Sequence, residues 1–309
     1  MIEFKTYEEQ IEILKDRRLL IKDQNSAKLF LEKNNYYNVI NAYKDIFLDK
    51  SQSREQFKSN TYFDYIVEIW RFDKNLNGIL FEYVTIVERT IKSKTAYLLS
   101  RQYGEQEEKY LNLENFSDRF KREAGVLVKN IKDVINSGIE RKNEMICHYY
   151  EKYNCIPLWV LVNALTFNRI NKFYQYLKEG IQKNIAKELG VLLGKQLYPV
   201  NIIKDLKIIN LFRNLCAHDQ RVFDFNAFSE VSPKHFINRY CGGNKTAVRL
   251  FALVCCFYDM LDKYDFNAFL MALNVLWNKA EKELPPDCKN ILYEKTGFPE
   301  NWRTLLNIV

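Results

Sequence analysis

One uninterrupted helical pattern constrains this chain more than any other feature of its sequence. Between Tyr62 and Ser100, apolar residues recur at intervals of three and four, and Gly78 is the only residue that obviously weakens a helix. The apolar positions that keep this period are Ile66, Ile69, Phe72, Leu76, Leu80, Val84, Val87, Ile91 and Leu98. The pattern predicts one long amphipathic helix across this stretch.

The rest of the sequence also favours helices over strands. Its 309 residues include only 10 Gly and 6 Pro, less than half of the usual shares of about 7% and 5%. Turn residues this scarce disfavour a sandwich or barrel of many strands, and no long strand-like alternation is present. With 47% hydrophobic and 28% charged residues, the chain can bury a large core. We therefore predict an all-α fold.

Capping signals predict where further helices begin. Thr6-Tyr7-Glu8-Glu9 has the form of a capping box, a hydroxyl at the N-cap and a glutamate three residues later. Asn25 or Ser26 is the expected cap of a second helix. Ser117 should cap a helix through Ile135, and Pro157 should begin a helix through Leu177. Other helices are expected over residues 181–193, 200–217, 247–261 and 266–279, with Pro285-Pro286 ending the last before a short tail.

The pattern divides the chain into three consecutive regions. We expect an N-terminal helical region over residues 1–58, a helical core over 59–231, and a C-terminal helical region over 232–309 that packs on the core. The longest apolar stretches reach only about 12 residues, whereas a membrane span needs roughly 20, so no membrane helix is expected. The N-terminus has no signal-peptide pattern, which predicts a cytoplasmic protein. Seven cysteines without a Cys-x-x-Cys pair indicate reduced thiols and no zinc site.

Positive charge is concentrated in one part of the sequence. The net charge is +7, and the stretch from Arg169 to Arg221 holds ten basic and four acidic residues, a local excess of +6. A basic zone of this kind attracts a polyanion such as RNA. A solvated, lysine-rich helical surface would give the same count, so both interpretations stay open.

Only one constellation of residues carries recognisable chemistry. The sequence has no Gly-rich phosphate loop, no His-Glu-x-x-His and no Gly-x-Ser-x-Gly. What remains is Arg213-Asn214-Leu215-Cys216-Ala217-His218, which contains one of only three histidines in the chain. On a straight helix, side chains five positions apart point about 140° away from each other. Arg213 and His218 therefore converge only if the helix ends or bends between them.

This motif resembles a known signature. Arg213-Asn214-x-x-Ala217-His218 matches the Arg-x4-His pattern of HEPN ribonucleases, and the flanking sequence is similar to abortive-infection proteins of the AbiD/AbiF type. The stretches that carry the resemblance are Thr6–Leu20, Asn34–Tyr37, Phe72–Leu76, Glu88–Ile91, Pro157–Val162 and Phe212–Arg221. Together they cover about residues 1–225, and the resemblance thins beyond Phe228.

The resemblance implies a fold and a function. It implies a HEPN-like helical bundle over residues 59–231 with additional N- and C-terminal helices, in a toxin-like protein that acts on RNA during bacteriophage infection. In such proteins two HEPN units pair to build a composite, metal-independent site that needs no cofactor. Because this chain has one copy of the motif, the resemblance implies a homodimer. It also implies RNA as the substrate, and the likeness to AbiF suggests a non-coding RNA as antitoxin.

The chemistry of the motif residues agrees with cleavage by the RNA's own 2′-hydroxyl. His218 could take the 2′-hydroxyl proton or protonate the leaving 5′-oxygen, while Arg213 offers a bidentate fork to the phosphate. Asn214 could orient the histidine or bond a phosphate oxygen. Three basic residues are predicted to contact the RNA backbone: Arg221, Lys204 and Lys207. No metal is expected, and the products should carry 2′,3′-cyclic phosphates.

A structural role remains an alternative for each residue of the motif. His218 would be favourably placed against a helix dipole, Arg213 could pair with Glu88 or Asp219, and Asn214 could act as a cap. The chain could then be a non-catalytic RNA-binding or scaffold protein of a defence or toxin–antitoxin system. The other two histidines, His148 and His235, are expected to be structural.

One known mode of toxin control does not suit this sequence. Some HEPN toxins are silenced by nucleotide transfer onto a tyrosine two residues after the motif histidine. Here that position is Gln220, which offers no phenol.

Overall fold

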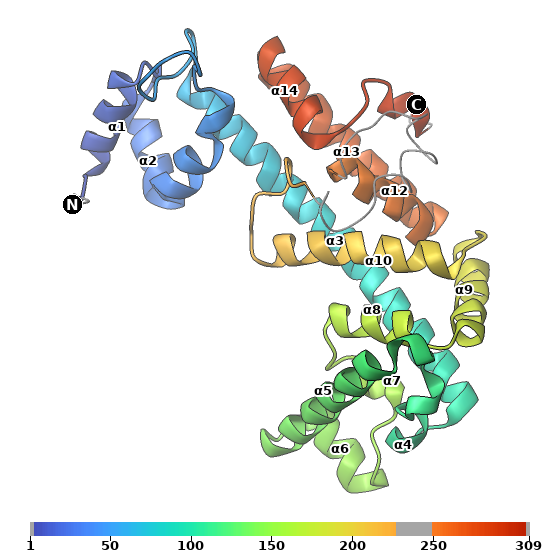
Figure 1. Cartoon of the computed structure of the whole chain (residues 1–309). Coiled ribbons are helices and arrows are strands. Elements are labelled where there is room, and N and C mark those ends of the chain that lie inside the picture. Colours follow the sequence, from blue (N-terminus) through green and yellow to red (C-terminus); the bar gives the residue numbers. More distant parts are fainter. Residues whose placement is uncertain (1–2, 227–248, 307–309) are drawn as a thin grey trace. The chain divides into compact units, whose positions relative to one another are not determined.

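The computed structural model describes residues 3–226 and 249–306, and this part of the chain is built from helices (Figure 1). Within these ranges, extended backbone pairs only as isolated bridges, and no β-strand is present. The all-α fold predicted from the sequence is confirmed. No helix in the described ranges combines the length and the apolar character needed to cross a membrane.

The first two helices show how capping sets a helix start. Helix α1, Tyr7–Asp16, begins with the predicted capping box, in which the Thr6 hydroxyl accepts from the Glu9 amide and the Glu9 carboxylate accepts from the Thr6 amide. Helix α2, Gln24–Asn34, is capped by Asp23, so the prediction of Asn25 or Ser26 is wrong. The Asp23 carboxylate accepts from the amides of both those residues, at 3.0 and 3.2 Å, and therefore starts the helix upstream of them.

The long apolar pattern forms a single helix. Helix α3 runs from Phe63 to Tyr103, 41 residues without a break, and the periodic apolar positions are buried. Gly78 does not interrupt it, and a Cβ at that position would meet no heavy atom within 4 Å. The glycine is therefore not required by packing, and the predicted long helix is confirmed.

The segment predicted as one helix from Pro157 to Leu177 is instead two helices. Helix α7, Leu158–Leu161, and helix α8, Phe167–Tyr176, are separated by a turn. The Asn163 amide donates back to main-chain oxygens of α7, and the Thr166 hydroxyl starts α8 by accepting from the Arg169 amide. Short polar side chains that bond the nearby backbone compete with helix continuation, which explains the break.

Ser117 also differs from its predicted role. It precedes a short 3-10 turn, Asp118–Phe120, and its hydroxyl makes no capping bond. The predicted helix starts after that turn, as α5, Lys121–Glu140. The C-terminal tail expected after Pro285 contains two more helices, α14, Pro286–Thr296, and α15, Trp302–Leu305. The other α-helices of the described residues are α4 Glu107–Tyr110, α6 Glu144–Tyr153, α9 Glu179–Leu193, α10 Pro199–Ala217, α12 Leu250–Met260 and α13 Lys263–Glu283.

The chain forms two compact units from segments that are far apart in sequence. The first unit combines Met1–Ile79, Leu215–Asn226 and Leu270–Val309, and the second combines Leu80–Asn214 and Ala227–Phe269. The C-terminal core of the first unit is aromatic, with the Trp277 ring 4.5 Å from Tyr293 and 5.2 Å from Phe298 between centroids. In the second unit, α5 packs against α6 and α8. Helices α3 and α10 each contribute residues to both units.

Candidate functional site

The Arg-x4-His motif lies where helix α10 ends. Arg213 is in the last turns of the helix, the helix stops at Ala217, and His218 is the first residue beyond it. The His218 amide donates to the Leu215 oxygen at 3.3 Å, and Gln220 donates to the same oxygen at 3.0 Å. The helix thus ends between the two motif residues. Arg213 belongs to the second unit and His218 to the first.

In the first unit, a buried aspartate fixes the chain that follows His218. Asp73 on α3 is 0% exposed, and its carboxylate accepts from the amides of Val222 at 3.0 Å and Phe223 at 2.8 Å. It also accepts from the Tyr43 hydroxyl at 2.6 Å. Burial raises the pKa of the Asp73 carboxyl to about 6. The three hydrogen bonds oppose this shift, because they stabilise the ionised form. Burial also raises the pKa of Tyr43 well above its ordinary value, so the phenol remains a donor.

Neighbouring residues on α3 hold the two residues between His218 and Arg221. The Lys74 ammonium donates to the Asp219 carbonyl oxygen at 2.8 Å and pairs with the Asp219 carboxylate at 2.7 Å. The Asn77 amide donates to the Gln220 carbonyl oxygen at 3.2 Å. Asp219 takes a left-handed conformation, with φ of 51°. These contacts define the path of the backbone on the C-terminal side of His218, whose own side chain is exposed.

His218 lines a cavity that contains several hydrogen-bond donors. The cavity has a volume of about 550 Å³ and lies wholly within the first unit. Its lining includes cationic and amide side chains, the imidazole and one carboxylate: Lys33, Lys74, Arg221, Asn34, Asn38, His218 and Asp219. Ammonium, guanidinium and amide groups are the donors that bind phosphate oxygens. An imidazole thus lies beside groups that can bond phosphate oxygens.

Arg221 is already engaged by partners inside the chain. Its guanidinium pairs with Asp45 at 3.0 Å and donates to Asp224 at 2.8 Å. It also lies over two aromatic rings, 5.2 Å from the centroid of Tyr43 and 4.7 Å from that of Phe223. These contacts give Arg221 a structural function, and its predicted contact with the RNA backbone stays a prediction.

In the second unit, Arg213 is held by a buried glutamate. Its Nε lies 3.3 Å from a carboxylate oxygen of Glu88, which is also paired with Lys92 at 2.7 Å. The sequence left this ion pair open as an alternative, and the structure contains it. The Nη1 and Nη2 atoms of Arg213 donate to no acceptor among the described residues. The pair with Glu88 therefore orients the guanidinium and leaves its terminal amino groups available to a phosphate.

The other predicted residues lie along α10 in the same unit. Asn214 and Lys207 are exposed, and Lys204 is half-buried. Their predicted roles stay predictions. Among the described residues, no group of three or more His, Cys, Asp and Glu side chains is placed to hold a metal ion. His235 lies outside the described residues, whereas His148 lies exposed on α6.

Sequence reasoning assigned no role to several residues of the cavity. Lys33, Asn34, Asn38 and Lys74 come from segments far from the motif. The signal that could have found them was weak but present, because two stretches that resemble abortive-infection proteins, Asn34–Tyr37 and Phe72–Leu76, contain or adjoin them.

Comparison with protein families identifies the class to which this chain belongs. The family model described as Abi-like protein matches residues 29–224, more than half of the chain. The chain is therefore a member of the Abi-like family, and this membership suggests a role in abortive infection. The matched range contains the Arg213–His218 motif, Asp73, Glu88 and all residues that line the cavity at His218. Comparisons with curated proteins and with solved structures find no match.

Proposed function

We propose that this chain is a metal-independent endoribonuclease of the HEPN type that acts as a toxin in abortive infection. The observation that carries the proposal is the exposed His218 imidazole at a cavity whose other donors include Lys33, Lys74 and the amides of Asn34 and Asn38. An acid–base group beside donors for a phosphodiester is what RNA cleavage by its own 2′-hydroxyl needs.

The proposed reaction uses no nucleophile from the protein. His218 takes the proton of the 2′-hydroxyl, whose oxygen attacks the adjacent phosphorus while the bond to the 5′-oxygen breaks. A protonated histidine, supplied by the second motif of a composite site, gives the leaving oxygen its proton. The guanidinium of Arg213 stabilises the negative charge that builds on the phosphoryl oxygens. The products are a 2′,3′-cyclic phosphate and a 5′-hydroxyl.

The test of this proposal is incubation of the purified protein with a mixed RNA pool in excess chelator. Cleavage should persist, because acid–base chemistry at His218 requires no metal ion. Complete inhibition by chelator, with recovery on addition of a divalent cation, would contradict the mechanism.

One observation favours a second candidate function, a non-catalytic RNA-binding or scaffold protein. The ion pair between Arg213 and Glu88 is what a purely structural arginine would make. The two candidates differ in what happens when the guanidinium is removed.

Replacement of Arg213 by alanine separates these candidates. Lys92 still pairs with Glu88 in this variant, so the buried carboxylate keeps a counter-ion and the fold should tolerate the change. If the endoribonuclease proposal holds, RNA cleavage falls by about 10²-fold, the usual cost of losing one oxyanion donor. Glu88→Gln should lower cleavage less, because the guanidinium remains. Two results together would favour the scaffold function. The wild type would cleave no RNA, and Arg213→Ala would lower the melting temperature without changing RNA binding.

We also propose that the active form is a homodimer about a two-fold axis. The chain contains one copy of the motif, whereas the proposed reaction needs one histidine as base and another as acid. Two-fold closure is the commonest oligomeric geometry. Sedimentation at micromolar concentration should give twice the chain mass of 37.0 kDa. A fully active monomer would contradict the composite site.

A further inference from the structure

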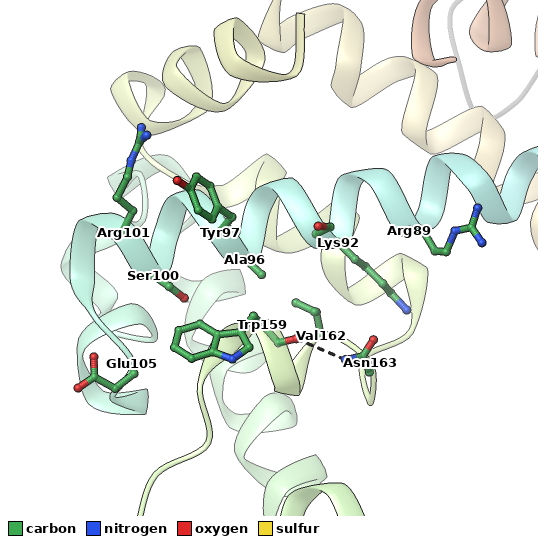
Figure 2. A pocket seen from close by; sticks show the side chains of 11 residues that line it. Arg89, Lys92, Ala96, Tyr97, Ser100, Arg101, Glu105, Trp159, Val162 and Asn163 are labelled. Atoms are coloured by element: carbon green, nitrogen blue, oxygen red, sulfur yellow. Dashed lines mark hydrogen bonds between the residues drawn. The ribbon is translucent and has the colours of Figure 1, made fainter. Parts of the chain in front are cut away.

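The second unit contains another cavity, formed by the C-terminal half of α3 and by α7 (Figure 2). Its volume is about 780 Å³, and every residue that lines it belongs to the second unit. The proposed cleavage reaction does not use it. A cavity of this size falls within the range of small-molecule sites.

A half-exposed tryptophan forms one wall of this cavity. Trp159 is 49% exposed, although its neighbours on α7, Leu158 and Val160, are 1% and 5% exposed. Figure 2 shows the indole below α3, on the side toward which Ala96 and Ser100 project. Together with Ser93 these small residues follow one face of α3 and leave space beside the ring. A large apolar ring next to an open slot suits a flat aromatic ligand.

Charged side chains also line the cavity. Three of them are cationic, Arg89, Lys92 and Arg101, and one is acidic, Glu105. Lys92 is paired with Glu88 at 2.7 Å, and Arg101 lies 3.8 Å from Glu188. Arg89 is exposed and makes no ion pair with any residue of the described ranges; Asp265 is the acid that interacts with it at longer range. Arg89 is therefore the cation most available to an anionic ligand.

We infer that this cavity binds a nucleotide, with its base against Trp159 and its phosphate near Arg89 and Lys92. A nucleotide is the ligand class that combines a flat aromatic ring with a phosphate a few atoms away. A free nucleotide and one unit of single-stranded RNA both carry this base and phosphate. The site is separate from the cavity at His218, and its occupancy does not require RNA cleavage.

The test measures binding of AMP and of a single-stranded hexa-adenylate whose 2′-hydroxyls are all methylated. Because the methylated oligonucleotide lacks the attacking hydroxyl, its binding is read independently of the proposed cleavage. Trp159→Ala should weaken binding of both probes by about 5- to 100-fold, the size of one base-stacking contact. Trp159→Phe should retain most of the affinity, and Arg89→Ala should weaken it several-fold.

Matched controls lie on the same unit. Tyr150→Ala removes another exposed aromatic residue, on α6, and Arg122→Ala another exposed arginine, on α5. Neither should change the affinity for AMP. Adenosine, which lacks the phosphate, and inorganic phosphate, which lacks the base, should each bind more weakly than AMP. Oligonucleotide binding that is tighter than AMP binding and is lost in Trp159→Ala would identify RNA as the source of the nucleotide, and the reverse order of affinities would identify a free nucleotide.

Three results would overturn the inference. Trp159→Ala could bind AMP as the wild type does, inorganic phosphate could bind as tightly as AMP, or Trp159→Ala could abolish dimerisation without changing affinity for AMP. The last result would show that a second copy of the chain covers the ring. If Trp159→Ala fails to fold, two other results together overturn the inference. Arg89→Ala would bind AMP as tightly as the wild type does, and the wild type would bind adenosine as tightly as AMP.

Discussion

Replacement of His218 by alanine is expected to lower RNA cleavage by about 10²–10⁴-fold, the usual contribution of a general acid–base group. The imidazole is exposed and lies at the end of α10, so its loss should leave helical content by circular dichroism unchanged. The measurement is the initial rate of cleavage of a labelled RNA at equal protein concentration. Asp219, Lys74 and Asp73 keep their contacts in the variant, because none of them bonds the imidazole.

The control for this experiment is His148→Ala. His148 is also exposed, on α6 of the second unit, and its ring contacts Tyr149 at 5.5 Å between centroids. This variant should cleave RNA at the wild-type rate. Equal activity of His218→Ala and the wild type would contradict a catalytic histidine, and loss of folding would favour a structural one.

The second large effect is expected on stability, from replacement of Asp73 by leucine. The change leaves three donors without their acceptor, the Val222 amide, the Phe223 amide and the Tyr43 hydroxyl. A buried donor without a partner costs about 1–3 kcal/mol, so the free energy of unfolding should fall by about 3–5 kcal/mol. Asp73→Asn keeps an acceptor oxygen and should lose less than half as much. Urea titration measures both values, and equal loss in the two variants would contradict this account.

The raised pKa of Asp73 also predicts how the stability of the fold changes with pH. Its pKa rises from 3.8 in the unfolded chain to about 6 in the fold, so the folded protein binds more protons between these values. The contribution of Asp73 protonation to the free energy of unfolding is therefore fully present below the unfolded pKa and is lost as pH rises through 6. The free energy of unfolding of the wild type, relative to Asp73→Asn, should fall by about 1 kcal/mol between pH 5 and pH 7. An increase over this range would show that the ionised carboxylate is the favoured form.

Elements that depend on local pattern could be predicted from the sequence. The period of α3 and the capping box at Thr6 are properties of neighbouring residues, and both are present. The second cap was missed because Asp23 stands two residues before Asn25, and several residues in a row were acceptable caps. The division of α7 from α8 was missed because apolar periodicity continues through Asn163, whose side chain bonds the backbone instead of favouring the helix.

The candidate site could be predicted only in part, because its motif is local in the sequence and the cavity beside it is not. The motif is contiguous, so the sequence alone could single out Arg213, Asn214 and His218 as candidates, and their joint role stays a prediction. The cavity beside His218 depends on contacts between residues that lie more than a hundred positions apart, such as Lys74 with Asp219. The period of α3 placed Lys74 on a helix but carried no information about what that helix packs against. Asp73 was equally hidden, since a buried aspartate in an apolar helix has no local signature.

The most direct test of the central claim, that His218 drives cleavage by the 2′-hydroxyl, is identification of the product ends by mass spectrometry. We expect the wild type to leave 2′,3′-cyclic phosphate and 5′-hydroxyl ends in the presence of chelator. His218→Ala should leave neither above background, and an RNA with methylated 2′-hydroxyls should remain intact. Products that end in a 3′-hydroxyl, or cyclic phosphates formed equally by the wild type and His218→Ala, would contradict the claim.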